Sequence, residues 1–141
     1  MLVPSWQNAP DFSVSDTGGA AVTLASALAS RKGAVFYFTM WCPICDQQMS
    51  DMRTVIPQYP TVGFYLVDYV SATVADAGSA ASANGYAGGG FTTLADISHL
   101  LLGDFQGTMG TTVIIDRNGV VRMNEDYKDG VKFRQVLAAL P

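Results

Sequence analysis

The sequence is short of charge and of long apolar runs, and each shortage argues against a class of protein. Only 14% of its 141 residues are charged while 49% are apolar, a composition that argues against an intrinsically disordered chain. No apolar run approaches the ~20 residues that a membrane-spanning helix needs, so we expect no membrane span. Acidic residues outnumber basic ones by 12 to 8 and the net charge is −4, so nucleic acid is not an expected partner.

Cysteine is scarce as well, and a leader segment is not visible. The two cysteines, Cys42 and Cys45, are too few for a disulfide scaffold. Residues 1–10 show neither the basic start nor the apolar core of a secretory signal peptide. The length predicts a single domain, 1–141, that is large enough to bury a hydrophobic core.

The two cysteines stand where a buried strand gives way to a helix. The aromatic run at residues 35–38 is typical of a strand that is buried on both faces. Pro43 directly follows the first cysteine, and proline is favoured at the first position of a helix. Pro57 ends that helix. Spacings of four, three and four residues predict its apolar face, at Cys45, Met49, Met52 and Ile56.

This placement gives the two thiols different chemistry. Cys42 lies at the helix N-terminus, where unpaired N–H groups and the positive end of the helix dipole favour the thiolate. Cys45 lies on the inner face, where desolvation favours the neutral thiol. We therefore expect Cys42 to attack a disulfide and Cys45 to resolve the mixed disulfide, with Trp41 covering the pair. A pair of buried structural cysteines is the alternative, but a CxxC motif between strand and helix is typical of a redox site.

The rest of the chain alternates strands and helices, which indicates an α/β fold. A strand, a helix and a strand in succession imply a right-handed crossover and parallel pairing of the two strands. Two hairpins are predicted in addition, the second with an Asn-Gly turn. The strands are expected at residues 12–15, 22–24, 62–68, 91–94, 111–116 and 120–123, and the further helices at 25–30, 73–83, 96–102 and 129–140.

Residues Tyr37–Cys45 resemble the active-site segment of the thioredoxin superfamily, a strand followed by Trp-Cys-x-x-Cys and a helix. Ala9–Phe12 with Gly18–Leu24, and Gly110–Val121, resemble two segments of its redoxin branch, which comprises TlpA/ResA-like thiol–disulfide oxidoreductases and AhpC/TSA-like peroxiredoxins. The resemblance implies a thioredoxin-like fold with a central mixed β-sheet flanked by helices. An N-terminal hairpin extension and an insertion before the last hairpin are part of that expectation.

The resemblance also implies a function. It implies a monomeric thiol–disulfide oxidoreductase that acts on protein thiols and disulfides together with a redox partner, without a cofactor or a bound metal. A periplasmic or other extracytoplasmic location is favoured, with the cytoplasm as the alternative. Catalysis is assigned to Cys42 and Cys45, and substrate binding to Trp41, Pro43, Met109, Gly110 and Thr111.

Two positions depart from the superfamily pattern. A cis-proline is expected opposite the CxxC motif, but that position is Gly110, and no proline lies between Pro60 and Pro141. Because a cis bond before a non-proline residue costs ~3 kcal/mol, we expect a trans bond and an unusual dihedral at Gly110. We also predict that Gly110→Pro still folds. Thioredoxins carry a buried acid six residues before the first cysteine, and here Phe36 replaces it, so proton transfer to Cys45 needs another group.

A peroxiredoxin-like peroxidase is the first alternative. Thr39 stands three residues before Cys42, as in the Thr-x-x-Cys motif of that family. The family's proline four residues earlier is replaced by Val35, and its arginine near the final hairpin aligns with Gly110. Without that arginine a peroxide would be poorly polarised.

A Sco-like copper chaperone is the second alternative. Such proteins carry Phe-Thr before a cysteine pair and a distant histidine, a pattern echoed by Phe38-Thr39, Cys42-Pro43, Cys45 and His99. Thiolates suit Cu(I), with Met40 or Met49 as additional ligands. The Sco cysteines are separated by three residues, however, whereas the gap here is two.

Overall fold

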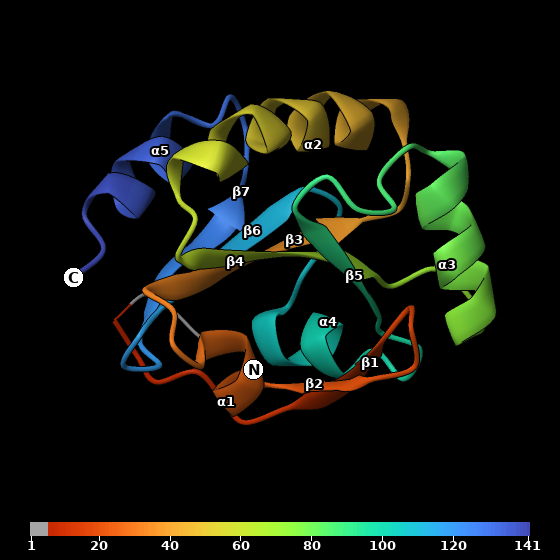
Figure 1. Cartoon of the computed structure of the whole chain (residues 1–141), viewed down its shortest axis with the longest axis horizontal. Helices are drawn as coiled ribbons and strands as arrows, with labels where there is room; N and C mark the ends of the chain where they lie inside the picture. Colours follow the sequence, from red (N-terminus) through yellow and green to blue (C-terminus); the bar gives the residue numbers. More distant parts are fainter. Residues whose placement is uncertain (1–5) are drawn as a thin grey trace.

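The computed structural model describes residues 6–141, which form one mixed β-sheet covered by helices (Figure 1). Residues 1–5 lie outside the described residues, so the first half of residues 1–10, where the sequence shows no signal peptide, is not part of this description. The helices are α1 (Leu24–Leu28), α2 (Pro43–Val55), α3 (Val74–Ala83), α4 (Leu100–Phe105) and α5 (Val131–Ala138), with a 3₁₀ turn, η1 (Ile56–Gln58), after α2. The strands are β1 (Ser13–Asp16), β2 (Ala21–Thr23), β3 (Gly33–Thr39), β4 (Val62–Asp68), β5 (Phe91–Ala95), β6 (Thr111–Asp116) and β7 (Val121–Asp126).

The strands stand side by side in the order β2-β1-β5-β4-β3-β6-β7. β3 and β4 run parallel over their full lengths, from the pair Gly33 and Val62 to the pair Thr39 and Asp68, and β5 runs parallel to β4. β6 is antiparallel to β3, and β7 to β6. Because the three parallel strands end at the same edge, the segments that follow them, including the two cysteines, meet there.

This arrangement is the expected thioredoxin-like fold. The hairpin β1–β2 is the predicted N-terminal extension, and it joins the sheet through β5. The segment α3–β5–α4 is the predicted insertion before the last hairpin, β6–β7. None of the helices among residues 6–141 is long and apolar enough to cross a bilayer.

β3 separates two apolar layers because successive side chains of a strand point to opposite faces. All seven of its residues are buried. Val35 and Tyr37 belong to a cluster between the sheet and α2 and α5, which we call the cysteine-side cluster; it also includes Cys45, Met49, Tyr86 and Tyr127. Phe36 and Phe38 belong to the far-side cluster, between the sheet and α1 and α4, with Phe12, Tyr65, Leu101 and Phe105 (Figure 1).

Some element bounds differ from the prediction for local reasons. α4 begins at Leu100 instead of residue 96, because the Asp96 carboxylate lies ahead of the helix and accepts the N–H groups of Leu101 and Leu102. α2 ends at Val55, which takes the place predicted for Ile56 on the buried face. β7 continues to Asp126, three residues beyond the prediction, because Thr111–Ile114 of β6 pair with it along that length.

Candidate active site

Cys42 is the N-cap residue of α2. Its backbone is extended (φ −83°, ψ 167°), and its Sγ accepts the N–H of Cys45 at 3.1 Å. Pro43 occupies the first helical turn as predicted, and it is exposed. The sulfur that would attack a disulfide therefore also satisfies one of the unpaired N–H groups of the helix.

Cys45 lies directly beneath, with 0% of its surface exposed, whereas Cys42 is half-buried. Both are free thiols in this structure. Cys45 begins the buried face of α2, which continues through Met49, Met52 and Val55. A second protein can therefore reach only Cys42.

The surroundings of the two sulfurs order their ionisation differently from the sequence-based expectation. Burial raises the pKa of the Cys42 thiol, its hydrogen bond with Cys45 and the charge of Cys45 raise it further, and the backbone N–H groups of Cys45 and Ile44 only partly offset this. Burial also raises the pKa of Cys45, but hydrogen bonds from the Cys42 thiol, the Met40 N–H and the Thr39 hydroxyl outweigh it and lower that pKa. These directions favour the first negative charge at Cys45 and the remaining proton on Cys42. They run against the expectation of a neutral Cys45, because that sulfur is desolvated among hydrogen-bond donors rather than among apolar groups alone.

Trp41 is fixed by a buried carboxylate that the sequence did not single out. Its indole Nε1 donates to Asp68 Oδ2 at 3.0 Å, and its backbone N–H donates to Thr39 Oγ1 at 3.0 Å. Asp68 is the last residue of β4 and is completely buried; its other oxygen accepts the N–H groups of Val70 and Ser71. Trp41 is half-buried beside the cysteine-side cluster, so one side of the indole stays open next to Cys42.

The loop Met109-Gly110-Thr111 reaches the same cluster. Met109 packs against the cysteine-side cluster, as Trp41 and Cys42 do. Gly110 donates its N–H to Phe38 O at 3.0 Å, and its carbonyl accepts the N–H of Tyr127 at 2.9 Å. A left-handed φ of +89° at Gly110 confirms the expected unusual dihedral, and no peptide bond within residues 6–141 is cis.

The backbone at Gly110 bears on the prediction that Gly110→Pro still folds. Proline fixes φ near −65° and carries no N–H. It can neither adopt +89° nor donate to Phe38, so the substitution would have to change this backbone and lose a hydrogen bond. The loop is held by two backbone hydrogen bonds instead of by a proline ring.

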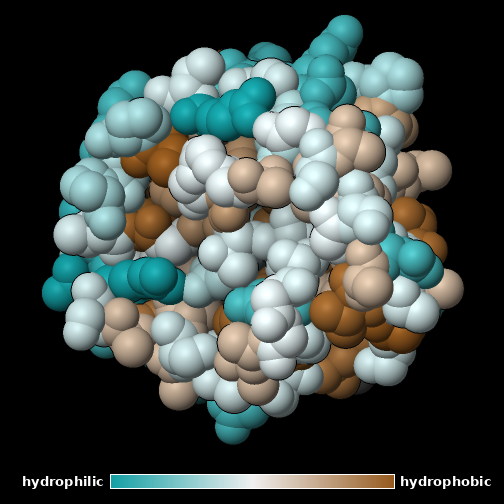
Figure 2. All heavy atoms as spheres, turned by 45° about the vertical axis from the view of Figure 1, so that its right-hand side comes forward, coloured by the Kyte–Doolittle hydropathy of each residue, from teal (hydrophilic) through white to brown (hydrophobic). Residues whose placement is uncertain are grey.

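Apolar side chains surround the entrance to the cysteines. Met40, two residues before the CxxC motif, is 47% exposed, and Ile44, within the motif, is 53% exposed. Val70 after β4, and Ile97 after β5, are exposed at the same edge of the sheet. Figure 2 brings this side of the molecule forward and shows brown apolar patches between hydrophilic ones. A partner chain that approaches Cys42 therefore meets an apolar rim.

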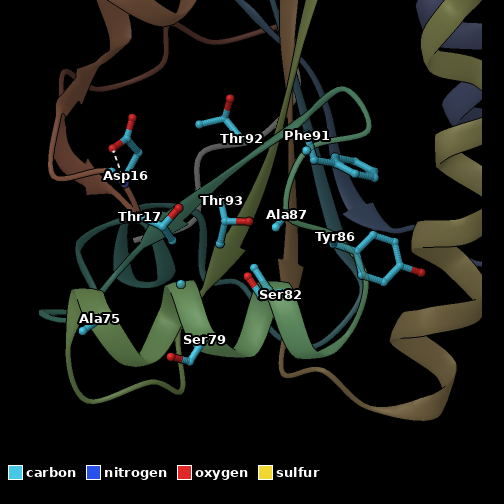
Figure 3. A pocket seen from close by; sticks show the side chains of 14 residues that line it. Asp16, Thr17, Ala75, Ser79, Ser82, Tyr86, Ala87, Phe91, Thr92 and Thr93 are labelled. Atoms are coloured by element: carbon cyan, nitrogen blue, oxygen red, sulfur yellow. Dashed lines mark hydrogen bonds between the residues drawn. The ribbon is translucent and has the colours of Figure 1, made fainter.

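Tyr86 supports the site from the glycine-rich segment between α3 and β5. Its ring is buried and lies 6.5 Å from that of Trp41, and its hydroxyl contacts Ser50 Oγ at 2.8 Å and Asp46 Oδ1 at 2.7 Å. A hollow of about 790 Å³ lies between α3 and β5, with Tyr86 at one end (Figure 3). Small and hydroxyl-bearing side chains line it, among them Thr17, Ser79, Ser82, Thr92 and Thr93. The hollow contains neither cysteine.

The copper-chaperone pattern is not assembled in the part of the chain that the structure describes. His99 precedes α4 and its Nε2 is hydrogen-bonded to Tyr69 O at 2.8 Å. Among residues 6–141, no three His, Cys, Asp or Glu side chains are grouped so as to hold a metal ion. The peroxidase pattern retains Thr39, which is buried beside Cys45.

Comparisons with known proteins agree with this geometry. A model of the AhpC/TSA family matches residues 6–124. No curated protein matches the chain. A putative protein disulfide isomerase from Bacteroides thetaiotaomicron is 18% identical, with a TM-score of 0.77 over 98% of this chain and 90% of that chain. Peroxidoxin BcpB from Mycobacterium tuberculosis is 19% identical, with a TM-score of 0.74 over 96% and 95%. The dsbF protein of MTB is 26% identical, with a TM-score of 0.69 over 92% and 98%.

Proposed function

The chain belongs to the AhpC/TSA family, and from that premise we propose that it is a thiol–disulfide oxidoreductase that uses Cys42 and Cys45 on protein substrates. The observation that carries the proposal is the placement of the two sulfurs. Cys42 caps α2 at the surface, and Cys45 lies buried one helical turn further on, within hydrogen-bond reach of it. If both cysteines were only structural, there would be no need for the Cys42 sulfur to be accessible from the surface.

The reaction follows from this arrangement. As the Cys42 sulfur attacks a partner's disulfide, its proton passes to the Cys45 thiolate; a Cys42–partner bond forms, and the partner's other sulfur leaves as a thiolate. Cys45 then loses its proton and attacks Cys42 Sγ, which forms the Cys42–Cys45 bond and releases the second partner thiolate. From this starting state the cysteine pair gives up two electrons and one proton, and the partner disulfide becomes two thiolates, which take up protons from water. The reverse sequence oxidises a partner dithiol.

The substrate surface that we propose comprises the open side of Trp41, the exposed Pro43 and the loop of Met109, Gly110 and Thr111. Its support is the shared cluster that brings Trp41, Cys42 and Met109 together, and the apolar rim around them. A single domain over 1–141, a monomeric state, a separate redox partner and an extracytoplasmic location belong to the same proposal. The reduction potential decides the direction, over a range from ~−270 mV for thioredoxin to ~−120 mV for DsbA.

A peroxidase is the second candidate, because the chain belongs to the AhpC/TSA family and Thr39 lies beside the cysteines. Its weakness is the position that aligns with the family's arginine. Gly110 stands there, and its left-handed backbone and crowded surroundings leave little space for a longer side chain. Thiol–disulfide exchange needs no such cation.

The test compares two activities of the purified protein. We expect it to catalyse the reduction of insulin disulfides by dithiothreitol, followed by turbidity, and to consume hydrogen peroxide no faster than the double variant Cys42→Ser/Cys45→Ser. Cys42→Ser should abolish exchange, whereas Cys45→Ser should accumulate mixed disulfides on Cys42, detected as adducts by mass spectrometry. Rapid peroxide consumption with no exchange would replace the proposal by the second candidate.

A further inference from the structure

Resting on the proposed function, we propose that Tyr37 is the positioning residue of the resolving thiol. Its hydroxyl donates to Gln48 Oε1 in this structure and turns to Cys45 Sγ when that sulfur carries negative charge. The thiol is thereby made ready for attack at a site that has no buried acid beneath it.

The first support is the position of the Tyr37 hydroxyl. The side chain has 0% exposure within the cysteine-side cluster, and its hydroxyl lies 2.5 Å from Gln48 Oε1. Gln48 is three residues after Cys45 on α2, and side chains at that spacing lie next to one another on a helix. The hydroxyl therefore sits under the part of α2 that carries the resolving sulfur.

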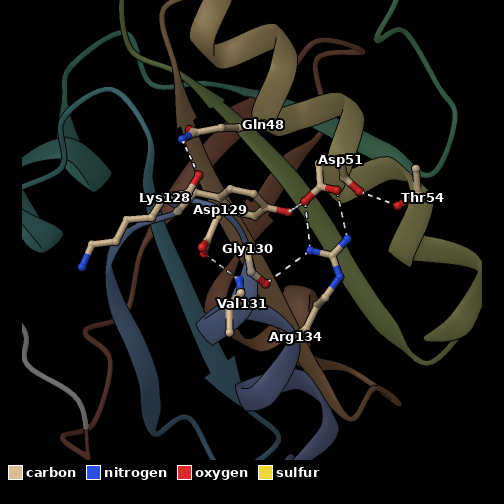
Figure 4. A network of polar contacts seen from close by, with 9 residues as sticks. Gln48, Asp51, Thr54, Lys128, Asp129, Gly130, Val131 and Arg134 are labelled. Atoms are coloured by element: carbon tan, nitrogen blue, oxygen red, sulfur yellow. Dashed lines mark hydrogen bonds and ion pairs between the residues drawn. The ribbon is translucent and has the colours of Figure 1, made fainter.

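The second support is the rigidity of this arrangement. Gln48 Nε2 donates to Lys128 O at 3.1 Å (Figure 4). Its Oε1 accepts the Tyr37 hydroxyl, so the amide is held at both ends. The Tyr37 ring meets the Tyr127 ring edge-on at 6.1 Å, and the Tyr127 hydroxyl donates to Asp51 at 2.7 Å. A donor fixed in this way gives up little conformational freedom when it turns to the sulfur.

The third support is the requirement for such a donor. A buried thiol must ionise before it attacks, and the position of the thioredoxin acid is Phe36, which faces the far-side cluster and stacks on Tyr65 at 5.0 Å. Tyr37, the next residue of β3, points to the opposite face, into the cluster that contains Cys45. β3 thus places the hydroxyl of Tyr37 on the side of the sheet that carries the cysteines, and the Phe36 ring on the other side.

Titratable groups around the sulfur favour a donor rather than a base. Cys42, the N-cap of α2, and Tyr37 on β3 lie on the same side as Cys45. The charges of both cysteines act on Tyr69 after β4, and the charge of Asp126 at the end of β7 acts on Tyr37. Burial, the charges of both cysteines, a hydrogen bond with Cys45 and the charge of Asp126 raise the pKa of Tyr37 far above its usual value. The phenol therefore keeps its proton throughout. The proton that Cys45 loses goes to water, and the departing partner thiolate takes one back from water.

The experiment separates the two steps by reacting the reduced protein with 5,5′-dithiobis(2-nitrobenzoate) in a stopped-flow instrument. The first thionitrobenzoate released reports attack by Cys42, and the second reports resolution by Cys45. For Tyr37→Phe we expect a second phase about tenfold slower at neutral pH, with its pH midpoint about one unit higher, the effect of losing one hydrogen bond to a charged sulfur. Tyr65→Phe removes a buried hydroxyl from the far-side cluster, where it meets Arg31 at 2.6 Å, and should leave the second phase unchanged.

Gln48→Leu gives a second, independent measurement. It removes the competing acceptor, so the hydroxyl is left to Cys45 and the pH midpoint should move down rather than up. General damage to the site would move both variants in one direction. The inference is overturned if Tyr37→Phe resolves like the parent, if Tyr65→Phe has the same effect, or if Gln48→Leu raises the midpoint; should Tyr37→Phe not fold, the Gln48→Leu result decides. A parent that releases no second equivalent would contradict the proposed function itself.

Discussion

Gly110→Ala is the substitution whose cost the structure defines best. The backbone there has φ +89°, which a residue with a Cβ adopts only under strain. An added Cβ would run into Asp126 Oδ1 and would lie 3.1 Å from Gln48 Oε1. Asp126 is exposed and can move away, but its Oδ2 then loses the hydrogen bond from the Lys128 N–H at 3.0 Å.

The magnitude follows from these two effects. The left-handed backbone costs a non-glycine residue roughly 1 kcal/mol, and the lost hydrogen bond costs about 1 kcal/mol more. We therefore expect Gly110→Ala to lower the free energy of unfolding by about 2 kcal/mol and Tm by roughly 8 °C for a chain of this length. Gly110→Pro should cost about 4 kcal/mol or more, because it also leaves the Phe38 carbonyl without its donor.

Urea unfolding at pH 7, followed by circular dichroism, measures these differences. The matched control is Asp126→Ala with and without Gly110→Ala. Once the carboxylate is gone, only the backbone strain of about 1 kcal/mol should remain. A Gly110→Ala protein within roughly 0.5 kcal/mol of the parent, or a Gly110→Pro protein as stable as Gly110→Ala, would refute this account of the loop.

Two other predictions concern carboxylates. Arg134 and Tyr127 donate to Asp51 and lower its pKa, so the ionised group stabilises the fold above the unfolded value of about 3.9 and loses this effect as pH falls through the lower folded value. Asp51→Asn should therefore cost roughly 1 kcal/mol at pH 7, since the pair is partly exposed, and this difference should shrink toward zero as pH falls below about 3.9, by urea titration at each pH. Asp68→Asn replaces an acceptor oxygen of the carboxylate that holds Trp41, so acrylamide should quench Trp41 fluorescence more strongly than in the parent, both measured in a Trp6→Phe background. The control Asp76→Asn, at an exposed position, should leave quenching unchanged. Equal quenching in both variants would contradict the anchoring role of Asp68.

The parts of the fold that the sequence predicted are those with local signals. The CxxC junction carries its own markers in the aromatic strand, the proline after the first cysteine and the apolar spacing along α2, and the Asn-Gly turn marks the last hairpin. The bound that shifted most, the start of α4, depends on a side chain: Asp96 binds the first N–H groups of the helix from four residues ahead of it. The sequence shows that an aspartate precedes α4, but not how many residues before the helix its carboxylate binds the N–H groups.

The residues that the sequence missed are those whose role depends on facing direction or on distant partners. Phe36, Tyr37 and Phe38 are all aromatic and all buried, so no alternation of polar and apolar residues shows which of them meets Cys45. Asp68 reads as a strand end, and its link to Trp41 spans 27 positions. The order of ionisation depends on the Met40 N–H and the Thr39 hydroxyl that meet Cys45 in three dimensions, and no spacing rule contains them.

The division of β3 between two layers has a consequence for how such a chain can evolve. Val35, Tyr37 and Thr39 point toward the chemistry, whereas Ala34, Phe36 and Phe38 point into a layer that does not include either sulfur. We expect substitutions in the far layer to change the stability of the fold while leaving the proposed redox chemistry of Cys42 and Cys45 unchanged. Substitutions in the near layer should alter that chemistry as well. Stability and the proposed reduction potential would thus be adjusted separately, through alternate residues of one seven-residue strand.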